Sequence, residues 1–167
     1  MTIVLQNLIG LLYNLIPMSD YIEKAVTILK ENSFRITKQR LFVIELLDKS
    51  KEALSAYEIK DKLQAKKLDV DVVSIYRIID CLEKNGLVHK VLSTNKVKKC
   101  KLEHEDTCEK HEDNHCHHLL ICEKCNSVEE IHCAGISTVI KKVESDSRFK
   151  IKTHNLEFHG ICNACKS

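Results

Sequence analysis

The stretch from His115 to Cys125 reads HCHHLLICEKC, and it joins a cluster of histidines to a Cys-x-x-Cys pair, Cys122 and Cys125. A second pair, Cys162 and Cys165, lies close to the end of the sequence. The two-residue gap lets one turn point both sulfurs of a pair at one ion, and four thiolates suit the tetrahedral geometry of zinc. One pair alone would also fit a redox motif. Two pairs that bracket a compact segment predict a structural zinc bound by all four cysteines, with two disulfides or four free thiols as the alternative.

The composition is that of a soluble globular protein. The chain has 167 residues, of which 44% are hydrophobic and 30% are charged, and this length is enough for one domain or two small ones. The number of cysteines, nine, is odd, and the chain shows neither a basic signal peptide nor an Ala-x-Ala cleavage site. We therefore expect metal binding in a reducing cytoplasm and no secreted disulfide scaffold.

Charge is unevenly divided along the chain, although the net charge is only +2. Residues 24–101 contain 18 Lys and Arg against 10 Asp and Glu, whereas residues 102–167 contain 8 against 12. A basic first part followed by an acidic part rich in Cys and His indicates a polyanion-binding domain joined to a metal-binding domain. A charged surface that is only solvated has the same counts, so the charges alone do not separate the two interpretations.

Residues 3–16 form an apolar run that is too short to cross a membrane, because a span needs about 20 apolar residues. No Lys or Arg precedes the run, which argues against a signal peptide. We interpret residues 1–17 as an N-terminal extension. Either Met18 is the real start and the extension is an artefact, or the extension is an amphipathic helix that packs on the body of the protein.

Apolar periodicity and capping residues predict four helices in the basic part of the chain. The first covers residues 20–31, and the second follows Thr37, which can cap it. Ser55 and Glu58 have the spacing of a capping box, so a third helix begins there. The fourth covers about residues 72–84 and ends at an Asn-Gly pair. Its apolar stripe has the spacing i, i+3, i+4 and i+7: Ile75, Ile78, Ile79 and Leu82.

Two strands, at residues 87–92 and 97–102, are predicted after the fourth helix, with a polar turn between them. Helices followed by a basic hairpin are typical of a winged helix-turn-helix, in which the helix before the hairpin enters the major groove. Opposite its apolar stripe, that helix carries Tyr76, Arg77, Asp80 and Lys84. Arg can bridge guanine or phosphate, and Tyr can touch a thymine methyl or a phosphate. The same residues also fit an ordinary solvated helix face.

The acidic part begins with a segment, residues 103–118, that is dense in Glu, Asp, His and Cys, and we interpret it as a hinge linker whose side chains can reach a metal. From His118 the pattern is strand, strand, helix and strand, with the last strand near Phe149–Phe158. A zinc held by the four cysteines would tie both ends of this small α/β unit. The predicted fold class is α+β, with a winged-helix DNA-binding domain over 18–102 and an α/β dimerisation and metal-binding domain with a four-cysteine zinc site over 119–167.

Five motifs carry a resemblance that covers about Tyr21 to Lys166: RITKQR (35–40), SIYR (74–77), LEKNGLV (82–88), HLLICEKC (118–125) and HGICNAC (159–165). Together they resemble the ferric-uptake-regulator family of metal-sensing transcription factors. The resemblance implies a homodimer on palindromic double-stranded operator DNA, with no substrate other than a metal ion. The DNA-binding residues on these motifs are Tyr76, Arg77, Arg40 and Lys38.

Within this family the chain is most similar to the zinc-uptake-regulator branch, on the segments HKV (89–91) and STN (93–95) and on Cys100. The resemblance implies one structural and one regulatory zinc in each subunit. The regulatory ligands that match are His89, Cys100, His115 and Glu130, with His117 as the runner-up for His115. A set of two histidines, one cysteine and one glutamate suits four-coordinate zinc.

The chain also departs from the family pattern. Ser74 stands where Thr is common, which keeps the hydroxyl group. Some members have a third site built on histidines like His118 and His154 with an acidic residue on the last helix, where this chain has Ser137. The cysteines at 108, 116 and 133 have no assigned role, although Cys116 lies among the histidines and could compete as a ligand.

The leading hypothesis is therefore a cytoplasmic, zinc-sensing repressor of zinc-uptake genes that is not an enzyme and has no catalytic residues. An iron or peroxide sensor of the same family is the alternative, and Cys100 argues against it because those branches favour His, Asp and Glu ligands. A zinc deaminase needs a Pro-Cys-x-x-Cys motif, and the one proline, Pro17, fits neither cysteine pair. A thiol redox switch is the most remote alternative.

Overall fold

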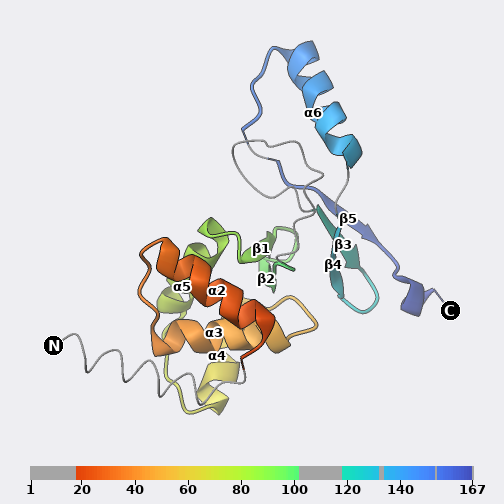
Figure 1. Cartoon of the computed structure of the whole chain (residues 1–167). Helices are drawn as coiled ribbons and strands as arrows, with labels where there is room; N and C mark the ends of the chain where they lie inside the picture. Colours follow the sequence, from red (N-terminus) through yellow and green to blue (C-terminus); the bar gives the residue numbers. More distant parts are fainter. Residues whose placement is uncertain (1–17, 102–117, 132–133, 153, 167) are drawn as a thin grey trace. The chain divides into compact units, whose positions relative to one another are not determined.

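The computed structural model describes residues 18–101, 118–131, 134–152 and 154–166. The chain divides after Cys100 into two compact units (Figure 1). The predictions for residues 1–17, for most of the linker and for the ligands His115 and His117 lie outside the described residues. The same holds for the cysteines at 108, 116 and 133.

The first unit begins with the four helices that periodicity predicts, and each has a side-chain N-cap. They are α2 (Asp20–Glu31), α3 (Lys38–Lys49), α4 (Ala56–Ala65) and α5 (Val72–Lys84). The caps are Ser19, Thr37, Ser55 and Asp71, and each accepts a hydrogen bond from the backbone amide three residues later. Helix α2 packs on α3, α3 on α4, and α4 on α5, as Figure 1 shows for the arrangement of the helices. Their buried apolar side chains form the core of this unit.

The core of the first unit is almost entirely aliphatic. Its largest fully buried side chains include two from each helix and one from the segment after α5. Branched aliphatic side chains fill such an interior without leaving polar atoms to satisfy. They are Ile22, Leu29, Ile44, Leu47, Ile59, Leu63, Ile75, Leu82 and Leu87.

A two-stranded hairpin follows α5 and consists of β1 (Val88–Val91) and β2 (Lys96–Lys99), paired antiparallel with Val88 opposite Lys99. Both strands are shorter than predicted. One further backbone bond continues the pairing beyond Val88 and Lys99, because the Cys100 amide donates to the Leu87 carbonyl at 2.9 Å. Val97 forms a bridge to Leu54, with hydrogen bonds of 2.8 and 2.9 Å, so the hairpin is fastened to the connection between α3 and α4.

The second unit contains a three-stranded sheet in the order β4-β3-β5. Strand β3 (His118–Cys122) pairs antiparallel with β4 (Val128–Ile131) and parallel with β5 (Glu157–Gly160). Helix α6 (Ala134–Ser147) lies between β4 and β5 in the chain, which confirms the predicted order of strand, strand, helix and strand. A short 3₁₀ helix, η1 (Asn163–Cys165), follows β5.

The last strand is much shorter than the predicted Phe149–Phe158, because β5 begins only at Glu157. Its pairing with β3 starts near the first residue of β3, with the Leu119 amide donating to the Leu156 carbonyl at 3.1 Å and Leu119 opposite Glu157. Within the part of the chain that the structure describes, no helix is long and apolar enough to cross a membrane.

The capping box of α4 also ties this helix to the hairpin. The Ser55 amide donates to the Glu58 carboxylate at 2.7 Å, and the Glu58 amide donates to the Ser55 hydroxyl at 3.2 Å. The Lys96 ammonium lies 3.0 Å from the same carboxylate. The Ser55 amide and Lys96 together hold the pKa of Glu58 at about 2, below its usual 4.5. The ionised carboxylate is therefore stabilised in the folded state.

We predict that Ser55→Ala lowers the free energy of unfolding by about 1 kcal/mol at pH 7, because one helical amide loses its acceptor. Glu58 should stabilise the fold above pH 4.5, and this contribution should disappear as the pH falls from 4.5 to about 2. Urea unfolding of Glu58→Gln, compared with wild type at each pH, should show a deficit that shrinks over this range. Asp61→Asn, which changes an exposed acid on the same helix, should show no such trend.

Candidate metal centres and DNA-binding face

The parallel pairing of β3 with β5 brings the two cysteine pairs together. Cys122 is the last residue of β3 and lies opposite Gly160 of β5, so the chain leaves both strands at the same edge of the sheet. Cys125 lies in the turn after β3, and Cys162 and Cys165 lie at η1. The four sulfur atoms lie within 4.8 Å of one another. This group of four thiols, which we call the four-cysteine cluster, can hold a metal ion.

Hydrogen bonds in the four-cysteine cluster favour the thiolate form that a metal requires. The Cys162 amide donates to the Cys122 sulfur at 3.4 Å, and this bond, together with the Cys125 amide, lowers the pKa of Cys122 to about 6. The Ser127 hydroxyl, 3.2 Å from the Cys125 sulfur, lowers the pKa of Cys125. The neighbouring sulfurs of Cys162 and Cys125 raise the pKa of Cys165 to about 12.

The raised pKa of Cys165 reflects the closeness of the other sulfurs, because neighbouring thiolates repel one another. A divalent cation would offset this repulsion between the thiolates. The six described cysteines are all free thiols, so the disulfide alternative does not describe this structure. The chemistry of four sulfurs at this spacing fits zinc.

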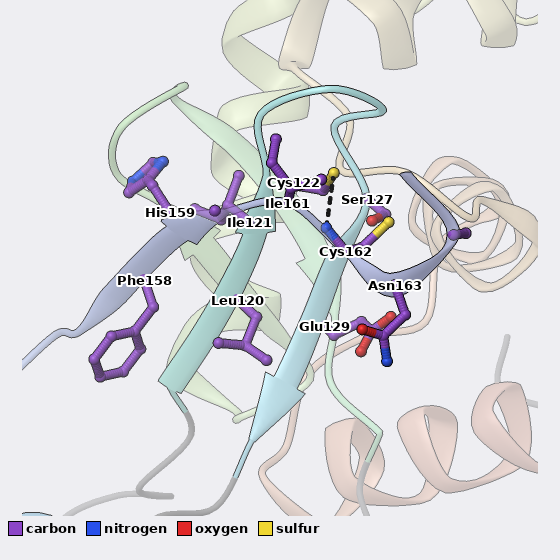
Figure 2. A pocket seen from close by; sticks show the side chains of 12 residues that line it. Leu120, Ile121, Cys122, Ser127, Glu129, Phe158, His159, Ile161, Cys162 and Asn163 are labelled. Carbon is purple, nitrogen blue, oxygen red and sulfur yellow. Dashed lines mark hydrogen bonds between the residues drawn. The ribbon is translucent and has the colours of Figure 1, made fainter. Parts of the chain in front are cut away.

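A cavity of about 370 Å³ opens on the sheet next to the four-cysteine cluster (Figure 2). Leu120 and Phe158, which are opposite each other in the β3–β5 register, lie on this face and are 38% and 45% exposed. Ile161 adds a third exposed apolar side chain, and Glu129 lies at the other side of Leu120. The second unit therefore presents an apolar surface that its own described residues leave uncovered.

Two of the predicted regulatory ligands lie close together within the first unit. His89 is on β1 and Cys100 directly follows β2, and a ring nitrogen of His89 and the Cys100 sulfur lie within 4.8 Å of each other. Cys100 is completely buried, whereas His89 is half-buried. Glu130 belongs to β4 of the second unit, where its carboxylate accepts a hydrogen bond from the Lys101 amide at 3.2 Å.

The histidines that the sequence offers as alternative ligands form a pair in the second unit. His118 begins β3 and is 1% exposed, and its ring centroid lies 5.5 Å from that of His154. The rings are tilted by 41°. Ser137 stands within α6, and a third metal site on these residues stays a prediction.

The exposed face of α5 contains the residues expected to contact DNA. Tyr76, Arg77, Asp80 and Lys84 are exposed, and the stripe that includes Ile75 and Leu82 is buried, as the helical periodicity predicts. Val73 extends this face towards the start of the helix and is 59% exposed. The Ser74 hydroxyl donates to the Asp71 carboxylate at 2.6 Å, so it is engaged in capping the helix.

The two basic residues expected from α3 differ in their surroundings. Lys38 is exposed, and its ammonium lies 6.0 Å from the centroid of the Phe42 ring. Arg40 is half-buried, and its guanidinium donates to the Arg35 carbonyl and lies 5.8 Å from the Phe34 ring centroid. Their role in DNA binding stays a prediction, and Arg40 already has partners inside its own unit.

Lys90 makes contacts that sequence reasoning missed. Its ammonium lies 3.1 Å from the Asp80 carboxylate and 2.5 Å from that of Glu83, both on α5. These acids raise the pKa of Lys90, Glu83 most strongly. The sequence shows opposite charges ten and seven residues before Lys90. Helical periodicity does not select these pairs, because Lys90 and the two acids lie on different elements.

Comparison with known proteins places these features in a family. Residues 31–159 match the model of the ferric uptake regulator family. The chain belongs to this family. Members of the ferric uptake regulator family are metal-responsive transcription regulators and not enzymes. The resemblance on which the site predictions depend is therefore confirmed.

The relatives of this chain within the ferric uptake regulator family are named after different metals. The chain is 30% identical to the zinc uptake regulation protein of Escherichia coli (strain K12) over 146 residues, which cover 87% of this chain and 81% of that protein. It is also 30% identical to the ferric uptake regulation protein of Bacillus subtilis (strain 168) over 149 residues, covering 89% and 96%. Sequence identity alone therefore does not select the metal.

A solved structure described as a zinc uptake regulator complexed with zinc and DNA has the same fold. Its TM-score with this chain is 0.77 at 28% identity, and the match covers 89% of this chain and 96% of that one. The chain thus has the mixed helix and sheet architecture of this family, together with a four-cysteine cluster that can hold a metal ion.

We predict that Cys162→Ser releases zinc from the four-cysteine cluster and disrupts both the second unit and the dimer. Structural zinc can contribute on the order of 10 kcal/mol of apparent binding energy, so losing one ligand should be severe. Zinc per chain, measured by elemental analysis, and the mass in solution test this. Cys81→Ala removes a thiol outside the cluster and should keep both properties. A folded Cys162→Ser dimer with full zinc would contradict the assignment.

Proposed function

We propose that this family member is a zinc-sensing repressor that binds palindromic operator DNA as a homodimer and controls zinc-uptake genes. The observation that carries the choice of zinc is the His89–Cys100 pair, whose donor atoms lie within 4.8 Å of each other. A buried thiol next to an imidazole is a donor pair that zinc accepts readily, whereas sites for harder ions are dominated by oxygen ligands. An iron or peroxide sensor built on His117, His118 and acidic ligands remains the alternative.

The regulatory site needs further ligands, and we assign Glu130 and His115 to it, with His117 as the alternative to His115. This assignment comes from the resemblance, and it makes a four-coordinate set with one thiolate. A zinc ion bound by this set would link the hairpin to ligands from beyond Cys100. We also assign the structural zinc to the four-cysteine cluster, which gives two zinc ions per subunit.

The hairpin is well suited to transmit metal binding to the rest of its unit, because lysines fasten it to the helices. Lys99 lies 2.6 Å from Asp48 on α3, and Lys96 lies 3.0 Å from Glu58 on α4. Lys98 donates to the backbone carbonyls of residues 50 and 51 at 3.0 and 2.6 Å. A force on His89 and Cys100 would therefore act on the whole helical unit and not on a loose loop.

Repression would follow from a shift in population. A metal ion favours the DNA-competent arrangement only if it binds that arrangement more tightly than the others. In a symmetric dimer, the competent arrangement is one in which two copies of α5 meet half-sites about one helical turn apart. The metal would raise DNA affinity by fixing that spacing, without touching the DNA.

Helix α5 would read the DNA sequence from the major groove with Tyr76 and Arg77. Both side chains are exposed on one face of α5, and the opposite face is buried in the core. The excess of Lys and Arg in residues 24–101 supports binding to a polyanion. The N-terminal unit is thus proposed to be a winged helix in which the hairpin is the wing.

The second unit would form the homodimer. Leu120 and Phe158 are exposed on the sheet, and Val139 and Val143 are 60% and 46% exposed on one face of α6. Exposed apolar surface of this kind often marks an interface. Burial against a second copy would stabilise a unit whose own core is small.

We predict that Arg77→Ala weakens specific DNA binding by about 1–3 kcal/mol while leaving zinc content and dimer unchanged. The reason is the loss of a charged, bidentate contact to a base or phosphate. Binding can be measured by fluorescence anisotropy on a duplex selected from a random pool with zinc-loaded wild-type protein. Lys142→Ala removes the same charge from α6 and should bind normally. Unchanged affinity of Arg77→Ala would show that α5 is not the reader.

We predict that Cys100→Ser spares the fold and the zinc of the four-cysteine cluster but abolishes zinc-dependent DNA binding, unlike Cys162→Ser. Cys81→Ser, which changes another buried thiol of the same unit, should keep the response. By linkage, DNA should raise the affinity of the regulatory zinc by the same factor that zinc raises DNA affinity. Titrations of the second zinc with and without the duplex measure that factor. A normal zinc response in Cys100→Ser would remove this residue from the sensor and favour the iron-type alternative.

A further inference from the structure

The exposed face of α5 contains a negative charge where a DNA-reading helix should be neutral or positive. Val73, Tyr76, Arg77 and Asp80 have the spacing i, i+3, i+4 and i+7, so they form one continuous stripe along the helix. All four are exposed, and Asp80 is part of this stripe together with the two proposed DNA contacts. A carboxylate close to phosphates is repelled by them, and juxtaposed like charges in an interface are costly.

Lys90 is placed to cancel this charge. Its ammonium contacts Asp80 at 3.1 Å and Glu83 at 2.5 Å, so one cation is shared between two carboxylates of α5. The side chains of Lys90, Asp80 and Glu83 are 36%, 54% and 38% exposed. Ion pairs as exposed as these contribute little to the free energy of folding. Folding stability alone therefore does not account for the placement of Lys90 between the two acids.

The position of Lys90 in the chain connects two functions. It directly follows His89, the proposed metal ligand on β1, and it reaches back to α5. The other hairpin lysines have different partners: Lys96 binds Glu58 of α4, Lys98 binds carbonyls before α4, and Lys99 binds Asp48 of α3. The ion pairs of Lys90 therefore connect α5 to the residue next to His89, a proposed metal ligand.

We propose that Lys90 is a positioning residue for DNA binding: it neutralises Asp80 and Glu83 on α5 and holds this helix to the strand that carries His89. This inference rests on the proposed function, in which α5 reads DNA and His89 binds the regulatory metal. Lys90 itself contacts neither the DNA bases nor the metal. Without it, Asp80 on the exposed stripe and the nearby Glu83 are both uncompensated, and α5 loses a tie to the strand that carries His89.

The test compares two charge-removing variants of the first unit, Lys90→Met in the hairpin and Lys24→Met on α2. Each removes one ammonium that is paired with a carboxylate, and methionine keeps most of the apolar stem. Both proteins are full-length and zinc-loaded, and the probe is the duplex selected with wild type. We expect Lys90→Met to weaken binding about tenfold or more, because it leaves Asp80 and Glu83 uncompensated on the proposed DNA-reading helix. Lys24→Met should weaken it about threefold or less, the effect of one lost charge.

Rescue distinguishes charge masking from loss of a DNA contact. Adding Asp80→Asn and Glu83→Gln to Lys90→Met should restore affinity to within about threefold of wild type, since the repelling charges are gone. Asp80→Asn alone should change affinity by less than about threefold, because Lys90 already neutralises that acid. Cobalt(II) substituted at the regulatory site gives an absorption spectrum that should be the same in all variants, which shows that the metal ligands are intact.

Equal losses in Lys90→Met and Lys24→Met would overturn the proposal, and so would a Lys90→Met defect that the two acid replacements do not rescue. These results differ from failure of the proposed function. If α5 did not read DNA, Arg77→Ala would bind the duplex as wild type does. If His89 did not bind the metal, the cobalt spectrum of His89→Ala would match that of wild type.

Discussion

The parallel pairing of β3 with β5 is the constraint on which the second unit depends. It aligns two strands that are distant in the chain, with Cys122 opposite Gly160, so that the Cys162 amide donates to the Cys122 sulfur 40 residues away. Three strands of four or five residues enclose few buried side chains, and such a small core seldom stabilises a fold by itself. A metal held by the four-cysteine cluster would close the loop between the strands and add its binding energy to folding.

The hairpin has the corresponding role in the first unit. Backbone pairing between Leu54 and Val97 and the ion pairs of its lysines hold it against α3, α4 and α5. Individually these exposed pairs are weak. Because they connect one short hairpin to three helices, they restrict its movement relative to all of them. If His89 and Cys100 bind the regulatory metal as proposed, a hairpin held in this way would pass that binding to the helices of the first unit.

The two units differ in their electrostatic properties. The first has a surplus of positive charge, and its exposed α5 face carries one acidic stripe residue that a lysine from the hairpin neutralises. The four-cysteine cluster of the second unit combines one strongly acidified thiol with one that resists ionisation. The first arrangement suits a polyanion, whereas the second suits a divalent cation, and the family to which the chain belongs combines both in one regulator.

The sequence by itself determined the helices of the first unit, two of their caps, Thr37 and Ser55, and the buried and exposed faces of α5. These features arise from interactions between residues three or four positions apart, which periodicity and capping rules detect. The spacing of the cysteine pairs also predicted the four-cysteine cluster. Only the tertiary structure decided that β5 begins at Glu157, that Arg40 is bonded to its own unit and that Lys90 reaches Asp80 and Glu83. The start of β5 and the contacts of Lys90 depend on sheet register and on the packing of the hairpin against α5, which sequence periodicity does not report. The Arg40 contacts with residues 34 and 35 are local, but they lie in the turn before α3, where helical periodicity does not apply.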